Sequence, residues 1–151
     1  MKTFLIIVLV SVSLVGLTSR ARAFDETPFD VRVNIPFTFY AGNTMLPKGH
    51  YVIRQLRDVD EKVFELQGED HIVSVLLEGR IVQAESVSDK AQVMFKKYGD
   101  KEILYRFFAL GQSQGIELNL SIHEKQAVKS GAAPEQHAVE ATSSASAKKT
   151  N

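Results

Sequence analysis

The feature that most constrains this chain is a regular alternation of apolar and polar residues. From Val31 to Phe39 every second residue is Val, Ile or Phe, and polar residues or Pro lie between them. Successive side chains of a β-strand point to opposite faces, so this pattern predicts a long strand with one buried face. Pro36 lacks a backbone N–H, and we therefore expect the strand to lie at a sheet edge or a bulge there.

Turn signals separate further apolar segments of the same kind. Residues 46–49 read Leu-Pro-Lys-Gly, which favours a tight turn, and Gly99-Asp100 between two apolar segments predicts a hairpin. Gly79 predicts a bend or bulge between strands at 71–77 and 81–85. Altogether about seven or eight short strands follow one another without long helical segments between them. We expect an all-β fold, an antiparallel β-sandwich or small barrel of seven to eight strands.

The end of the chain changes in character. The last apolar alternation runs from Ile116 to Ile122. It favours a strand over the alternative of a helix in residues 115–123, because on a helix its apolar residues would fall on two opposed faces. After about residue 124 the composition shifts to Ala, Ser, Lys and Glu. Such a segment buries too little apolar surface to offset its ordering entropy. We expect a β-sandwich domain over residues 24–124 and a disordered low-complexity tail over residues 125–151.

Residues 1–23 predict a secretory signal peptide. Lys2 supplies a basic start, an apolar segment follows from Phe4 to Leu17, and Ala21-Arg22-Ala23 places small residues before a cleavage site. About 14 residues are fewer than the ~20 that span a bilayer, so we expect cleavage and no membrane span in the processed chain. The chain has no Cys and hence no disulfides. These features predict a bacterial protein exported to the periplasm or the extracellular space.

Cleavage also changes the net charge. The full chain has 18 basic and 18 acidic residues, and loss of Lys2, Arg20 and Arg22 leaves a mature chain with a net charge of −3. Nucleic-acid-binding surfaces usually carry clustered positive charge. Only Lys96-Lys97 and Lys148-Lys149 are adjacent basic pairs in the mature chain. We therefore expect no nucleic-acid partner.

Three motifs carry a resemblance to a known family. Residues 33–39 read Val-Asn-Ile-Pro-Phe-Thr-Phe, residues 46–52 read Leu-Pro-Lys-Gly-His-Tyr-Val, and residues 97–100 form a Lys-Tyr-Gly-Asp turn. From about Val31 to Leu110 the chain resembles an uncharacterised family of small exported bacterial proteins, with a V-P-F-x-F strand and an L-P-x-G-x-Y hairpin. Asn34-Ile35 stands where that family often has a second Val. The resemblance implies an all-β fold and no assigned activity.

One motif matches a catalytic pattern. Residues 111–115 fit the nucleophile elbow G-x-S-x-G, with Ser113 as the nucleophile and His123 downstream. That chemistry needs the serine on a strand-to-helix turn beside an oxyanion hole. The segment after Ser113 alternates like a strand, so we interpret the motif as a polar loop and predict no catalytic residue.

Metal and cofactor motifs are equally weak. The residues from Asp58 to Glu61 lack the ligand spacing of a calcium loop. Zinc ligands often lie a few residues apart in the chain. The four histidines, which are His50, His71, His123 and His137, do not lie at such short spacing. We predict no metal site and no cofactor. Most aromatic residues lie at alternating strand positions and are expected in the core, and Tyr98, Tyr105 and Phe108 are the candidates for exposure.

These predictions favour a non-enzymatic binding module, envelope-associated or secreted, whose partner is an unknown protein or cell-envelope component. An edge strand near Val31 to Tyr40 would offer main-chain groups for strand addition. The alternative is a small β-barrel that carries an apolar ligand in a Phe-lined cavity of ~300 Å³ or more. A serine hydrolase using Ser113 ranks well below both. A membrane-spanning barrel is disfavoured because segments 71–77 and 103–110 are apolar on both faces.

Overall fold

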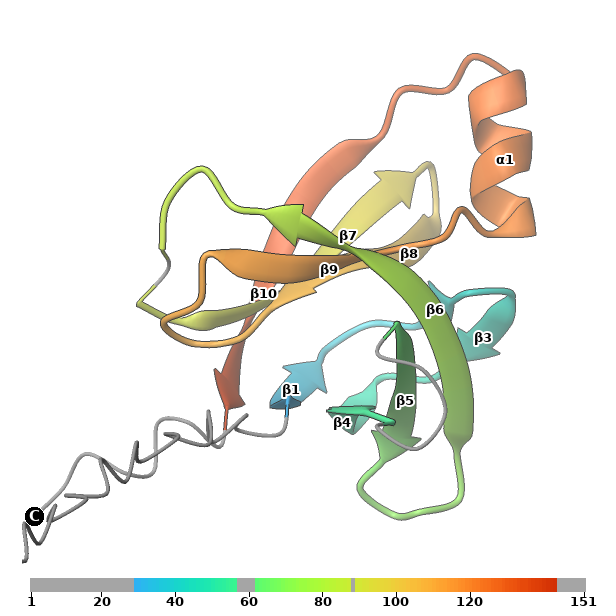
Figure 1. Cartoon of the computed structure of the whole chain (residues 1–151). Helices are drawn as coiled ribbons and strands as arrows, with labels where there is room; N and C mark the ends of the chain where they lie inside the picture. The colour runs from blue at the N-terminus through green and yellow to red at the C-terminus, as the bar shows by residue number, and fades with distance from the viewer. Residues whose placement is uncertain (1–28, 57–61, 88, 144–151) are drawn as a thin grey trace, which may run out of the picture.

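The computed structural model describes residues 29–56, 62–87 and 89–143, so the predicted signal peptide (1–23) lies outside the described residues. The described chain forms ten strands and one short helix (Figure 1). In chain order these elements are β1 (Asp30–Ile35), β2 (Phe39–Ala41), β3 (Thr44–Leu46), β4 (Gly49–Gln55), β5 (Val63–Gly68), β6 (Ser74–Gln83), β7 (Ala91–Tyr98), β8 (Lys101–Phe108), β9 (Gln114–Leu118), α1 (Ile122–Lys129) and β10 (Glu135–Ser143).

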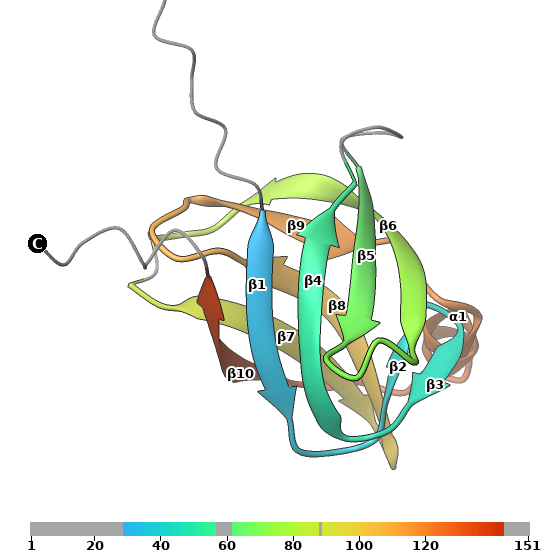
Figure 2. The ribbon, with the colours of Figure 1, turned by 90° about the horizontal axis from the view of Figure 1, so that it is seen from below.

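Eight of the strands close an antiparallel barrel, whose ring is visible in Figure 2. Neighbours follow the order β8-β7-β10-β1-β4-β5-β6-β9, and pairing of β9 with β8 joins the two ends. The β2–β3 hairpin lies outside this ring and attaches through a parallel β2–β8 contact. The predicted all-β antiparallel fold is confirmed, and its form is the barrel.

Apolar side chains fill the interior of the barrel. The largest fully buried side chains include Phe39, Phe64, Phe95 and Phe107. The rings of Phe64 and Phe107 meet edge to face, with centroids 5.2 Å apart and an interplanar angle of 76°. Burial of a side chain of this size stabilises a fold by about 1.5–3 kcal/mol. This core holds together a chain that has no Cys for disulfides.

The predicted disordered tail is wrong for residues 125–143. Part of this segment forms α1, and β10 inserts between β1 and β7, with Val139 opposite Val93 and Ser143 opposite Val31. The less exposed side chains of β10 are His137, Val139, Ala141 and Ser143, so Val139 is the one large apolar residue among them. Ladder hydrogen bonds on both of its edges hold it instead. The domain therefore extends to Ser143, beyond the predicted boundary at 124.

The strand predicted from Ile116 to Ile122 is right only in its first part. β9 ends at Leu118, and α1 begins at Ile122. Ser121 caps this helix, because its Oγ accepts a hydrogen bond from the backbone N of Glu124 at 3.0 Å. A helix start therefore replaces the last part of the predicted strand.

Gly79 lies inside one continuous strand rather than between two. The first half of β6 (Ser74–Glu78) pairs with β5, and the second half (Gly79–Gln83) pairs with β9. A Cβ atom on Gly79 would lie 2.7 Å from the carbonyl oxygen of Glu117. The close approach of β9 at the centre of β6 therefore requires Gly.

The edge strand predicted near Val31 to Tyr40 is also wrong. β1 pairs with β10 on one side and with β4 on the other, and β2 pairs with both β3 and β8. Pro36 follows the last residue of β1, where its missing N–H removes no ladder hydrogen bond. The predicted hairpin at Gly99-Asp100 is confirmed, since β7 ends at Tyr98 and β8 begins at Lys101.

Candidate functional site

The first half of β6 has an edge without a strand partner. Gly79 N donates to Lys62 O at 3.1 Å and Gly68 N donates to Val73 O at 2.9 Å, so odd-numbered residues of β6 direct their backbone groups to β5. The backbone groups of Ser74 and Leu76 point to the opposite edge. None of the strands that the structure describes pairs with them there. We call residues 74–78 the β6 edge.

The β6 edge is bounded at both ends. At one end Asn119 N donates to Glu78 O at 3.0 Å, which continues the β9 ladder by one residue before the chain turns into α1. At the other end lies the β5–β6 turn, in which Asp70 Oδ1 accepts a hydrogen bond from Ile72 N at 3.1 Å. Between these limits the edge offers alternating backbone donors and acceptors, as an unpaired strand does.

Exposed apolar side chains flank the β6 edge. Leu76 is 66% exposed and Ile72 is 82% exposed, while Leu120 and Ile122 follow the end of β9 and are 51% and 55% exposed. Large apolar side chains gathered at a free strand edge are typical of a surface that binds another chain.

The β2–β3 hairpin lies beside this edge in both Figure 1 and Figure 2. A Cβ atom on Gly42, in the turn of the hairpin, would lie 3.8 Å from Leu77 Cδ2 of β6. β3 pairs with β2, and its other edge has no partner among the described strands. Met45 in the middle of β3 is 62% exposed. The hairpin therefore adds a second free edge and a further apolar side chain to the same region.

Acidic side chains lie close to the β6 edge. Glu65 on β5 is opposite Leu76, and its Oε1 accepts a hydrogen bond from Ser74 Oγ at 2.6 Å. Glu78 is exposed two residues after Leu76, on the same face of β6. An extended segment with apolar and basic residues would match this combination of side chains.

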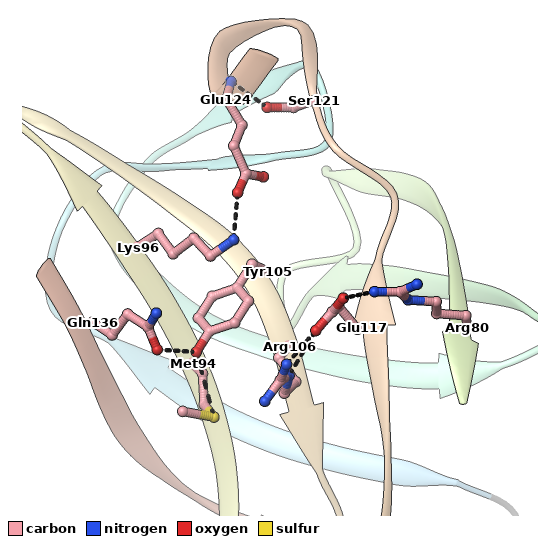
Figure 3. Close-up of polar contacts among 9 residues, drawn as sticks. All are labelled: Arg80, Met94, Lys96, Tyr105, Arg106, Glu117, Ser121, Glu124 and Gln136. Atoms are coloured by element: carbon pink, nitrogen blue, oxygen red, sulfur yellow. Dashed lines mark hydrogen bonds and ion pairs between the residues drawn. The ribbon is translucent and has the colours of Figure 1, made fainter. Parts of the chain in front are cut away.

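Side-chain contacts of its first turn hold helix α1 beside the β6 edge (Figure 3). Lys96 Nζ on β7 lies 2.6 Å from Glu124 Oε1, and the Glu124 side chain is only 3% exposed. Burial raises the pKa of Tyr98, and the negative charge of the Glu124 carboxylate, to which the hydroxyl is hydrogen-bonded, raises that pKa further. Asn43 Oδ1 in the hairpin accepts from Ile122 N at 2.8 Å. These contacts fix where the chain goes after β9.

A second polar network covers the outer face of β8, also drawn in Figure 3. Tyr105 is the extra residue of a β-bulge, because Met94 pairs with Arg106 and Phe95 pairs with Leu104. The Tyr105 hydroxyl donates to Gln136 Oε1 at 2.9 Å. Burial raises the pKa of the Tyr105 hydroxyl. The hydrogen bond between Tyr105 and Gln136 therefore joins β8 to β10.

Glu117 on β9 joins this network to β6. Its carboxylate accepts hydrogen bonds from the guanidinium groups of Arg106 and Arg80. The hydrogen bond from Arg106 lowers the pKa of Glu117, and Arg80 lowers it further. Each of these charges has an opposite charge beside it, so the network stabilises the outer face of the barrel.

The residues of the G-x-S-x-G motif do not form a nucleophile elbow. Ser113 is exposed in the loop that enters β9, whereas the motif needs a strand-to-helix turn. His123 lies beyond the other end of β9, and its ring stacks on Tyr40 with centroids 4.2 Å apart. The structure therefore does not bring Ser113 and His123 together.

The histidines are dispersed over the barrel. His50 and His71 are exposed, and His137 Nε2 contacts Glu102 Oε2 at 2.7 Å. Within residues 29–56, 62–87 and 89–143, no group of three or more His, Asp or Glu side chains is placed to hold a metal ion. Asp58 to Glu61 lie outside the described residues.

The three aromatic residues predicted as candidates for an exposed surface are buried. Tyr98, Tyr105 and Phe108 are 7%, 4% and 6% exposed. The ring of Phe108 packs against Gly115, where a Cβ atom would lie 2.3 Å from it. Sequence reasoning missed the β6 edge, because the exposed Leu76 lies in segment 71–77, which is apolar on both faces and therefore carries no signal of exposure.

No helix in the described part of the chain is long and apolar enough to cross a membrane. Comparisons of the chain with models of protein families, with curated proteins and with solved structures found no match.

Proposed function

We propose that this chain is an exported, non-enzymatic interaction protein that binds an extended segment of a partner protein by strand addition at the β6 edge. The observation that carries the proposal is the unpaired backbone of Ser74 and Leu76, beside a Leu76 side chain that is 66% exposed. Main-chain hydrogen bonds supply affinity in this mode of recognition, and pockets for alternate side chains supply specificity.

The chemistry of the edge restricts the partner. A bound strand would place alternate side chains next to Val75 and Leu77, which face the barrel interior, so these positions favour apolar residues. The intervening side chains would lie next to Leu76 and near Glu65 and Glu78, where a Lys or Arg side chain can contact both apolar and acidic groups. We therefore expect a segment in which apolar and basic residues alternate.

The alternative of a carrier for an apolar ligand has less support. The interior of the barrel is occupied by side chains of the protein itself. Phe29, Phe64 and Phe107 contact one another with ring centroids 5.2 to 5.6 Å apart. A ligand in this position would have to displace packed aromatic rings, which proteins resist because their cores are close-packed.

A substitution pair at Ser74 tests the proposal. Ser74→Pro removes the outward N–H and leaves the hydrogen bonds to β5 in place, while Ser74→Ala loses the same hydroxyl and keeps the N–H. The probe is a fluorescein-labelled octapeptide in which Val alternates with Lys, and the measurement is fluorescence anisotropy. We expect Ser74→Ala to bind within about twofold of the unmodified protein and Ser74→Pro at least tenfold more weakly.

Two outcomes would contradict this proposal. One is equal binding by Ser74→Pro and Ser74→Ala when circular dichroism shows both variants to be folded. The other is the absence of saturable binding by the unmodified protein up to about 1 mM probe. If Ser74→Pro fails to fold, Leu76→Lys replaces it, since this change repels a basic probe at the same edge and is also expected to weaken binding.

Export is a separate part of the proposal and has its own test. The full chain would be expressed in a bacterium with a standard secretion pathway, and the exported product would be analysed by mass spectrometry. We expect a mature chain that begins at Phe24. Retention of Met1 on a cytoplasmic product would contradict export.

A further inference from the structure

We infer that residues 119–123 are an in-chain competitor for the β6 edge and regulate the proposed binding site by extending β9. In the structure these residues leave β9 and start α1, so the edge is open. In the second state they would continue β9 along β6 and close it. This inference rests on the proposed function at the same edge and deepens it.

The register of the β6–β9 ladder aligns the segment with the edge. Leu118 is opposite Gly79, and Asn119 N already donates to Glu78 O at 3.0 Å. Continued antiparallel pairing would place Ser121 opposite Leu76 and His123 opposite Ser74. The backbone groups of Leu76 and Ser74 are those left unpaired in the structure. The chain thus carries its own candidate strand, adjacent to the edge and in register with it.

The side-chain pattern of the segment suits the extended state. Leu120 and Ile122 continue the alternation of Ile116 and Leu118, which face inward and are 8% exposed. In the structure Leu120 and Ile122 are 51% and 55% exposed. Extension would turn both toward the barrel interior, next to Leu77 and Val75 of β6. Apolar burial therefore favours the closed state.

A small number of contacts hold the segment in the open state. α1 has eight residues, a length at which an isolated helix is marginal, and Glu124 is its one buried residue. The Ser121 cap, the Asn43 contact to Ile122 N and the ion pair of Glu124 with Lys96 fix its first turn. The balance between the two states depends on these groups.

The connection to β10 is long enough for both states. The residues from Glu124 to Pro134 link the segment to β10, which begins at Glu135. About 11 residues span up to roughly 36 Å when extended. β10 can therefore keep its place between β1 and β7 while α1 unwinds.

Amide hydrogen exchange by NMR, with and without the Val-Lys octapeptide, tests the inference. In the Ser121→Ala/Glu124→Gln variant we expect residues 122–124 to lose helical chemical shifts. We also expect the Leu76 amide to exchange at least tenfold more slowly and the octapeptide to bind about tenfold more weakly. Ser130→Ala, which loses a hydroxyl bonded to Ala127 O at the other end of α1, is the matched control and should behave as the unmodified protein.

The outcomes separate the two proposals. If residues 122–124 stay helical in the double variant, or lose the helix without slower exchange of the Leu76 amide, the in-chain competitor is overturned whatever the octapeptide does. If the unmodified protein does not bind the octapeptide but the double variant shows the slower exchange, the proposed function fails and the β9 extension stands.

Discussion

Lys96 on β7 and Glu124 on α1 form an ion pair, with 2.6 Å between Nζ and Oε1. Its two members differ in exposure, because the Glu124 side chain is 3% exposed and that of Lys96 is 21% exposed. Loss of its partner therefore costs more free energy for the buried Glu124 carboxylate than for the more exposed Lys96 ammonium group. The ion pair holds α1 against β7 of the barrel. It therefore determines the path of the chain beside the β6 edge.

Loss of the lysine should cost more stability than loss of the carboxylate charge. We expect Lys96→Met to lower the free energy of unfolding by about 3 kcal/mol, since it leaves a buried charge without its partner. Glu124→Gln should lower it by about 1–2 kcal/mol, because the amide can still accept from Lys96. Urea denaturation measures both. Lys90→Met in the exposed pair with Glu140 is the control, with an expected change much smaller than that of Lys96→Met. Equal losses of stability at Lys96 and Lys90 would contradict this role of the buried pair.

Addition of a methyl group at Gly79 should disturb the join between the two halves of β6. Gly79→Ala places a Cβ atom 2.7 Å from the backbone oxygen of Glu117, and we expect a loss of roughly 2–3 kcal/mol. Gly49→Ala is the matched control, since its Cβ atom would meet Tyr51 at an ordinary 3.6 Å. Its expected effect is within about 1 kcal/mol. Thermal unfolding followed by circular dichroism compares the two, and a larger loss at Gly49 would argue against the close approach.

Removal of β10 should unfold the barrel. A chain that ends at Ser130 lacks the strand that pairs with both β1 and β7, so these two strands would have no partner between them. We expect this chain to lose cooperative urea unfolding, and a chain that ends at Ser143 to keep it. If the shorter chain unfolds cooperatively with the same midpoint, β10 is not part of the folded unit.

Stability should fall at alkaline pH because of three buried tyrosines. Burial raises the pKa of Tyr51, Tyr98 and Tyr105 above the ordinary value of 10.0. The folded protein therefore keeps these phenol protons at a pH where the unfolded chain releases them, so stability decreases as the pH rises above about 10. Urea midpoints between pH 8 and 11.5 measure the decrease, and Tyr105→Phe should reduce its slope. A midpoint that stays constant to pH 11 would contradict this assignment.

The strands and most turns could be predicted from the sequence, because they depend on local signals. The alternation from Val31 onward, the Leu-Pro-Lys-Gly turn and the hairpin at Gly99-Asp100 each follow from residues close together in the chain. β10 could not be predicted in this way. Its place is fixed by ladder hydrogen bonds to β1 and β7, which are distant in sequence, and Val139 is the one large apolar residue on its less exposed side.

The candidate site could not be predicted for a related reason. Whether a strand edge is free depends on which strands lie next to it, and the alternation in β1 carries no information about its neighbours. The sequence placed the free edge near Val31 to Tyr40, whereas the structure places it at residues 74–78. The end of β9 is a similar case, since the apolar alternation continues to Ile122 while the Ser121 cap and Glu124 start a helix.

Strand addition at the β6 edge is tested by a titration of the ¹⁵N-labelled protein with the Val-Lys octapeptide, followed by NMR. We expect saturable shifts that centre on residues 74–78, together with slower hydrogen exchange of the Ser74 and Leu76 amides. Saturable binding with shifts centred on core residues such as Phe64 and Phe107, and unchanged exchange at Leu76, would contradict strand addition at the β6 edge.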